Sequence, residues 1–159
     1  MMTKQTFFFN QNVVAWLALV SAVGLHVFDE AMTDFLPTYN QIVLDLRNQL
    51  GFFPAPTFSF AVWLTGLIAA IILGYSMTVF VARGGKVIRI ITTILGILMV
   101  VNALSHFFGS IYYGKVFPGT WSSPFLLAAA LFVTIRGFSG EWQAKRTADN
   151  ATDSVKHEI

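Results

Sequence analysis

Apolar residues fall into four long runs along the chain, separated by shorter polar segments. A membrane-spanning helix needs about 20 mostly apolar residues, and runs of this kind cover about 13–33, 58–82 and 87–109. A fourth run, about 119–137, is weaker because its continuous apolar part is short, although the prolines near its start suit the first turn of a helix. We therefore predict four spanning helices; a half-inserted fourth helix is the main alternative.

The long loop between the first two runs has a helical pattern of its own. Its apolar residues recur on one helix face and its polar residues lie mostly off that face. We expect an interfacial amphipathic helix at about 38–51; a helix packed over the ends of the bundle is the alternative. After a membrane domain of residues 1–138, the polar segment 139–159 predicts a flexible cytoplasmic tail. The first run lacks a small-residue cleavage site, so we expect it to remain as a span.

The composition indicates a membrane protein and excludes several functions. Hydrophobic residues make up 55% of the chain and charged residues 11%, whereas soluble domains carry about 25% charged residues. We therefore expect an all-α fold, a polytopic membrane helix bundle surrounded by the lipid bilayer. A net charge of +2 is too small to indicate nucleic-acid binding, and the lack of cysteine excludes disulfides, thiolate metal ligands and a cysteine nucleophile.

The basic residues predict how the chain lies in the membrane. With four spans, eight of the ten lysines and arginines fall on the side that holds both termini, and only Arg47 and Lys115 fall on the other. Cytoplasmic loops are enriched in basic residues. We therefore expect a multi-pass protein of the bacterial inner (plasma) membrane with both termini in the cytoplasm.

Polar side chains interrupt the first and third runs near their outer ends. His26, Asp29 and Glu30 are three and four residues apart, so they share one face of the first helix, as Asn102 and His106 do on the third. At a rise of 1.5 Å per residue, His26 lies about 20 Å along its helix, and the other pair about 22 and 28 Å along theirs. The two clusters reach a similar depth, so we expect them to form one polar site. The alternative is an acidic cap where the first helix leaves the membrane.

These residues resemble the pattern of the HXXEE family of small membrane proteins. The His-x-x-Glu-Glu motif matches at 26–30, with Asp29 in place of the first glutamate, and the family's Asn-x-x-x-His segment matches at 102–106. The similarity covers about 13–132 and continues in the family's last motif, at Tyr113, Pro118, Gly119 and Thr120. The family is named for a sequence pattern, so the resemblance implies a small membrane protein but no reaction.

The first function class that the polar residues support is a membrane-embedded enzyme acting on a lipophilic small molecule. His26, Glu30 and His106 would bind a single divalent metal, zinc or iron, as two imidazoles and a carboxylate leave one position open. Glu30, Asp29 and Asn102 are the candidate catalytic side chains. The carboxylate that does not bind the metal would be a general base or the partner of a histidine, and Asn102 would orient a ligand or donate to an oxyanion. A metal-free acid–base site, in which carboxyl and imidazole groups move protons, is the variant of this hypothesis.

The second class is a non-enzymatic binding, small transport or assembly protein. Its buried polar residues would lock the helices together or carry a proton. A transporter with four spans in 159 residues would be a homo-oligomer. The sequence lacks paired helices broken by glycine and proline in its two halves, which counts against transport.

Overall fold

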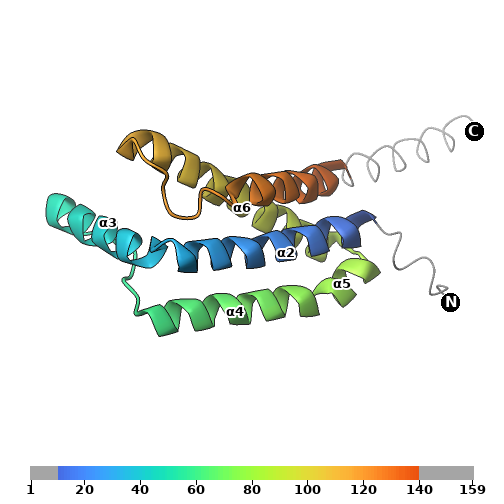
Figure 1. Ribbon diagram of the computed structural model, residues 1–159. Coiled ribbons are helices and arrows are strands. Elements are labelled where there is room, and N and C mark those ends of the chain that lie inside the picture. The colour runs from blue at the N-terminus through green and yellow to red at the C-terminus, as the bar shows by residue number, and fades with distance from the viewer. Residues whose placement is uncertain (1–10, 140–159) are drawn as a thin grey trace, which may run out of the picture.

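The computed structural model describes residues 11–139, which form a bundle of helices with no strand in that range (Figure 1). This confirms the predicted all-α fold class. The tail predicted from residue 139 lies outside the described residues except for its first residue, which ends the last helix. In chain order the helices are α2 (Gln11–Met32), α3 (Phe35–Leu50), α4 (Phe60–Ser76), α5 (Thr78–Arg83), α6 (Lys86–Tyr113) and the last helix (Ser123–Ser139).

Three segments of the described chain are long and apolar enough to cross a membrane. They are Gln11–Met32, Phe60–Arg83, which joins α4 and α5, and Lys86–Tyr113. The last helix, Ser123–Ser139, is apolar but shorter. It begins four residues later than the predicted start at 119, because the residues before it form turns that fold against α2 rather than extend the helix.

The amphipathic helix predicted at about 38–51 is α3, which begins at Phe35 and ends at Leu50. Asp34 and Gly51 bound it, and both adopt left-handed backbone conformations that break the helical path. Only two of its side chains are buried, and α3 projects beyond the end of α2 (Figure 1). Its location in the membrane interface stays a prediction.

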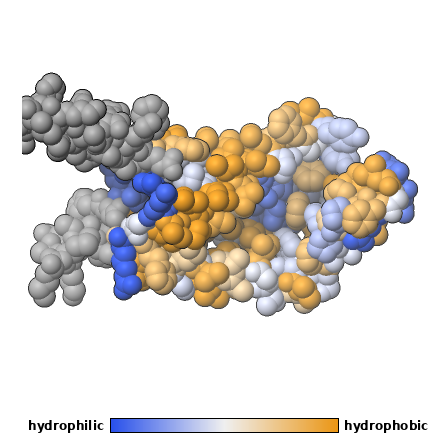
Figure 2. All heavy atoms as spheres, turned by 180° about the vertical axis from the view of Figure 1, so that it is seen from behind, coloured by the Kyte–Doolittle hydropathy of each residue, from blue (hydrophilic) through white to orange (hydrophobic). Residues whose placement is uncertain are grey.

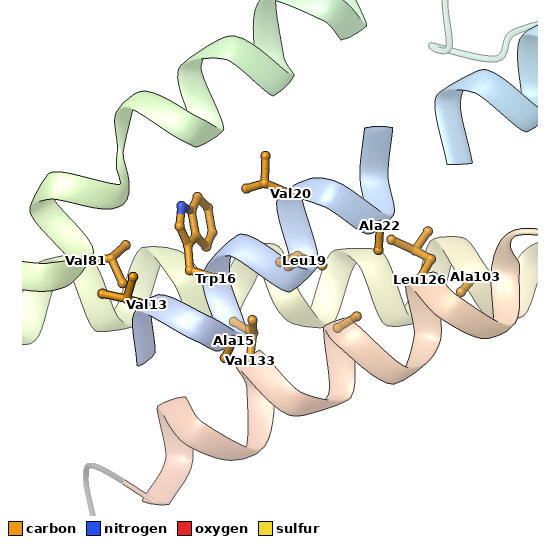
Figure 3. Packing of buried hydrophobic residues seen from close by; sticks show 11 residues of the cluster. Val13, Ala15, Trp16, Leu19, Val20, Ala22, Val81, Ala103, Leu126 and Val133 are labelled. Atoms are coloured by element: carbon orange, nitrogen blue, oxygen red, sulfur yellow. The ribbon is translucent and has the colours of Figure 1, made fainter. Parts of the chain in front are cut away.

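The central helix of the bundle is α2, which lies between α4 and the last helix (Figure 1). Its buried residues recur at helical spacing, and Trp16 and Val20 point toward α4 and α5 (Figure 3). The Trp16 indole also donates a hydrogen bond of 2.8 Å to the backbone oxygen of Gly74. Alanines make up much of the remaining core and let the helices approach closely; the core comprises Val13, Ala15, Trp16, Leu19, Val20, Ala22, Val81, Ala103, Leu126, Ala130 and Val133.

The outer surface of the bundle is apolar, as a lipid environment requires. No residue of α4 is buried, although most residues of this helix are hydrophobic. Figure 2 shows hydrophobic side chains over the middle of the molecule and hydrophilic ones gathered toward its two ends. An apolar surface this extensive marks a membrane or partner surface. The apolar helices are therefore consistent with a bilayer as their surroundings.

Candidate metal centre

Two helices carry the central residues of the site. His26 and Glu30 lie one turn apart on α2, so the helical repeat places both on the face turned toward α6. His106 lies on α6 and meets them there. All three side chains are buried, with exposed fractions of 4%, 5% and 1%. Polar groups this deeply buried need hydrogen-bond or metal partners, so their side chains are held in a defined arrangement.

The three side chains direct one donor atom each toward a common point. The Nε2 atoms of His26 and His106 are 3.1 Å apart. The Glu30 Oε1 atom lies 3.4 Å from the first and 3.3 Å from the second. The trio therefore forms a nearly equilateral triangle of two imidazole nitrogens and a carboxylate oxygen, which could hold a metal ion.

Hydrogen bonds on the far side of each ring fix the protonation of the imidazoles. The Nδ1 atom of His106 lies 2.5 Å from the backbone oxygen of Pro118, which can only accept, so this nitrogen carries the hydrogen. The Nε2 atom of a neutral His106 then has its lone pair free. This lone pair faces the other two donor atoms of the triangle.

His26 reaches the same state through a serine. Its Nδ1 atom lies 2.8 Å from the Ser122 hydroxyl oxygen. The single hydroxyl hydrogen of Ser122 is directed to Asp29 Oδ2, at 2.7 Å, or to a backbone oxygen at 3.2 Å, and both of these accept. The serine oxygen must therefore accept from His26 Nδ1, and the Nε2 atom of a neutral His26 also presents a lone pair. Such orientation of metal-binding histidines by a second layer of partners is usual in metal sites.

Asp29 supports the triangle but does not belong to it. Its carboxylate accepts two hydrogen bonds from Ser122, from the backbone N–H at 2.8 Å and from the hydroxyl at 2.7 Å. Helical spacing groups Asp29 with Glu30 and does not reveal the role of Ser122. Ser122 stands just before the last helix, where a serine is usually explained as a helix cap. Its position in the sequence therefore gives no sign of the contact with His26.

The segment before the last helix covers the site closely at Gly119. This residue has a φ of +82°, and a Cβ atom there would lie 2.7 Å from Cε1 of His106 and 3.1 Å from Cγ of Glu30. Only glycine allows both the left-handed conformation and this close approach. The glycine N–H also donates to the Thr33 hydroxyl at 3.1 Å, which ties the segment to the end of α2.

Asn102 is not brought into the triangle. It lies one turn before His106 on α6, and its side chain is only partly buried. Its Oδ1 atom is buried without a hydrogen-bond partner in the described part of the chain. The shared helix face that the sequence predicted for this pair therefore does not give Asn102 a hydrogen bond with the central residues.

A cavity of about 380 Å³ adjoins the site at Glu30, between the end of α2 and the beginnings of α3 and α4. Four of its lining residues are aromatic, Phe35, Phe58, Phe60 and Trp63, and besides Glu30 the polar Asp34 and Asn40 also line it. The Phe35 ring also packs against His106, with ring centroids 5.5 Å apart. One wall of the cavity is thus polar at the carboxylate, and most of the rest suits an apolar ligand.

The fold and the site together define a small helical membrane protein whose helices enclose a buried His–Glu–His group. A family model described as "Protein of unknown function with HXXEE motif" matches residues 16–134. The chain therefore belongs to the HXXEE family, as the resemblance of its motifs predicted. No curated protein and no solved structure matches the chain.

Proposed function

We propose that His26, Glu30 and His106 bind one divalent metal ion, and that the chain is a membrane-embedded enzyme acting on a lipophilic substrate. The observation that carries this proposal is the triangle of donor atoms, with edges of 3.1, 3.3 and 3.4 Å. Tetrahedral zinc with bonds of about 2.0–2.1 Å holds neighbouring donor atoms about 3.3 Å apart. The trio matches one face of such a tetrahedron and leaves the fourth position for water or substrate.

The donor set is consistent with zinc or ferrous iron. Two imidazoles and a carboxylate form catalytic zinc sites, and the same set occurs in non-haem iron sites. A metal held here would supply a Lewis acid that polarises a substrate oxygen or activates water. The chain's own contribution is orientation, because Pro118 and Ser122 fix both rings through their Nδ1 atoms.

The cavity beside Glu30 supports a lipophilic substrate. Glu30 belongs both to the triangle and to the cavity wall, so a ligand in the cavity lies next to the proposed metal. The aromatic wall favours an apolar body, and the carboxylate end favours a polar reactive group. We assign Glu30 as the side chain that meets substrate and Asp29 as a positioning residue; a role of Asn102 stays a prediction.

The proposed orientation in the membrane follows from the basic residues. We place both termini in the cytoplasm and the site near the outer surface of the bacterial inner membrane, with the last helix as a fourth span. Lys115 then lies outside, on the segment that leads to the site, and Arg83 inside.

A metal-free role is the second candidate, because the same triangle also suits hydrogen bonds. If one imidazole carried a second hydrogen, the Nε2 atoms and Glu30 could share it over the observed distances. The group would then lock α2 to α6, or move protons as an acid–base site. Membrane hydrogen bonds of this kind contribute about 0.6–2 kcal/mol.

Metal analysis of the purified protein separates the two candidates. We expect about one zinc or iron ion per chain in the wild type and a loss of this metal in His26→Ala and His106→Gln. Ser105→Ala is the matched control, since this exposed serine on α6 donates its hydrogen bond to the backbone oxygen of Asn102 in its own helix. Metal-free wild-type protein that stays metal-free after incubation with zinc and with ferrous iron, while its helical circular dichroism is intact, would refute the metal proposal.

A further inference from the structure

We propose that a second cavity, at the opposite end of the bundle, binds a phosphate group, the anion shared by phospholipid headgroups and free phosphate. This cavity has a volume of about 470 Å³. It lies where the start of α2, the turn between α5 and α6, and the end of the last helix come together. Asn12 in its wall is about 20 Å along α2 from His26, so the cavity is separate from the candidate metal centre.

Within residues 11–139, the cavity is lined by no acidic residue and by three basic ones: Lys86, Arg89 and Arg136. Throughout residues 11–139, the only ion pairs are those of the His–Glu–His group, so no carboxylate of that range neutralises these three charges. Uncompensated cations around a concave, partly apolar site attract an anion.

Arg89 supplies the most specific indication of a ligand. Its Nε atom is buried and has no hydrogen-bond partner within the described chain. The corresponding nitrogen of Arg136 donates to Asn12 Oδ1 at 3.2 Å, which holds that side chain at the cavity. An arginine presents several N–H donors in a planar fork that fits two oxygens of a phosphate. Because this atom has almost no solvent exposure, the Arg89 side chain would turn toward the cavity on binding, which would give the donor the phosphate as a partner.

The rest of the wall favours a lipid as the source of the phosphate. Trp16, Val81 and Val133 line the cavity, and all three are buried core residues. They would contact the carbon chain next to a lipid phosphate, whereas a free phosphate ion makes no use of them. In the proposed orientation this end also faces the cytoplasmic leaflet, where basic pockets between helices bind anionic headgroups.

Binding of short-chain lipids to the full-length protein in neutral detergent tests the proposal. We expect short-chain phosphatidylglycerol to bind more tightly than short-chain phosphatidylcholine, whose choline cation opposes the basic residues. Arg89→Gln and Arg136→Gln should each weaken phosphatidylglycerol binding about fivefold, as expected for one basic contact. Arg83→Gln is the matched control, since Arg83 lies at the same end but outside the cavity, over the Phe80 ring.

Competition identifies the source of the anion. Displacement of phosphatidylglycerol by millimolar inorganic phosphate would support a soluble phosphate ligand, and resistance to it would support the lipid. Equal affinity for the two lipids, with no effect of either arginine substitution in folded protein, would overturn the site. If a variant fails to fold, the salt dependence of phosphatidylglycerol binding to the wild type tests the site instead. Binding that does not weaken with rising salt would overturn the proposed site. These outcomes do not depend on metal binding at His26.

Discussion

Replacing Ser122 with alanine tests how the candidate metal centre is oriented. The Ser122 hydroxyl accepts from His26 Nδ1 at 2.8 Å and donates to Asp29 at 2.7 Å, so the substitution removes both contacts. It leaves the metal-binding atoms themselves unchanged. Loss of such a second-layer partner typically lowers metal affinity by about 10- to 100-fold, equivalent to about 1.4–2.8 kcal/mol. We expect a loss of this size for zinc.

The neighbouring Ser123 provides a matched control. It is fully buried and donates to the backbone oxygen of Gly119 at 2.8 Å, but it has no hydrogen bond to His26 within the described residues. Ser123→Ala and Ser122→Ala should both reduce the stability of the metal-free protein by about 1–3 kcal/mol, because each leaves a buried polar group without its partner. Only Ser122→Ala should also lower metal affinity.

The assay is a competition titration of zinc against a chromogenic chelator, with the protein purified in detergent. Thermal unfolding of the metal-free proteins in the same detergent gives the stability change. Equal zinc affinities for the two serine variants would refute the reasoning that Ser122 orients His26. A loss of affinity only in proportion to unfolded protein would lead to the same conclusion.

Three further substitutions test the fold and its orientation. Gly119→Ala should destabilise the protein by about 2–4 kcal/mol, through left-handed strain and a close contact with a buried histidine. Gly114→Ala should cost only about 1–2 kcal/mol of strain, because nothing lies near a Cβ atom added there. Denaturant unfolding measures both costs, and equal costs would contradict the packing argument. Trp16→Phe should cost about 1 kcal/mol for the lost hydrogen bond, and an unchanged unfolding midpoint would contradict it. The chain has no cysteine, so Lys115→Cys should react with a membrane-impermeant maleimide in intact cells and Arg83→Cys only after permeabilisation; the reverse pattern would invert the proposed orientation.

The helices and half of the candidate site follow from local sequence patterns. Apolar runs of spanning length predict α2, the α4–α5 segment and α6, because a continuous apolar helix is stable in a lipid bilayer. The four-residue spacing of His26 and Glu30 brings them to one helix face by the geometry of the helix alone. Counting residues along two helices also places His106 at a suitable depth.

The choice among neighbouring polar residues was not predictable in this way. Asp29 and Glu30 both lie within reach of His26 on the helix, and only the packing against α6 directs Glu30 into the triangle and Asp29 toward Ser122. Asn102 and His106 likewise share a helix face by spacing, yet of the two only His106 lies within hydrogen-bond distance of His26 and close to Glu30. Helical spacing permits a range of directions, and the rotation of each helix about its axis selects one of them.

The sequence by itself determined the helices, their apolar surfaces and the pairing of His26 with Glu30, because each depends on residues within a few turns of one another. Only the tertiary structure decided that the segment before the last helix folds back over the site. That contact brings Ser122 to His26 across 96 residues of chain and places Gly119 against the buried triangle. The physical reason is that these hydrogen bonds and close approaches depend on how separate helices pack, which no local repeat encodes.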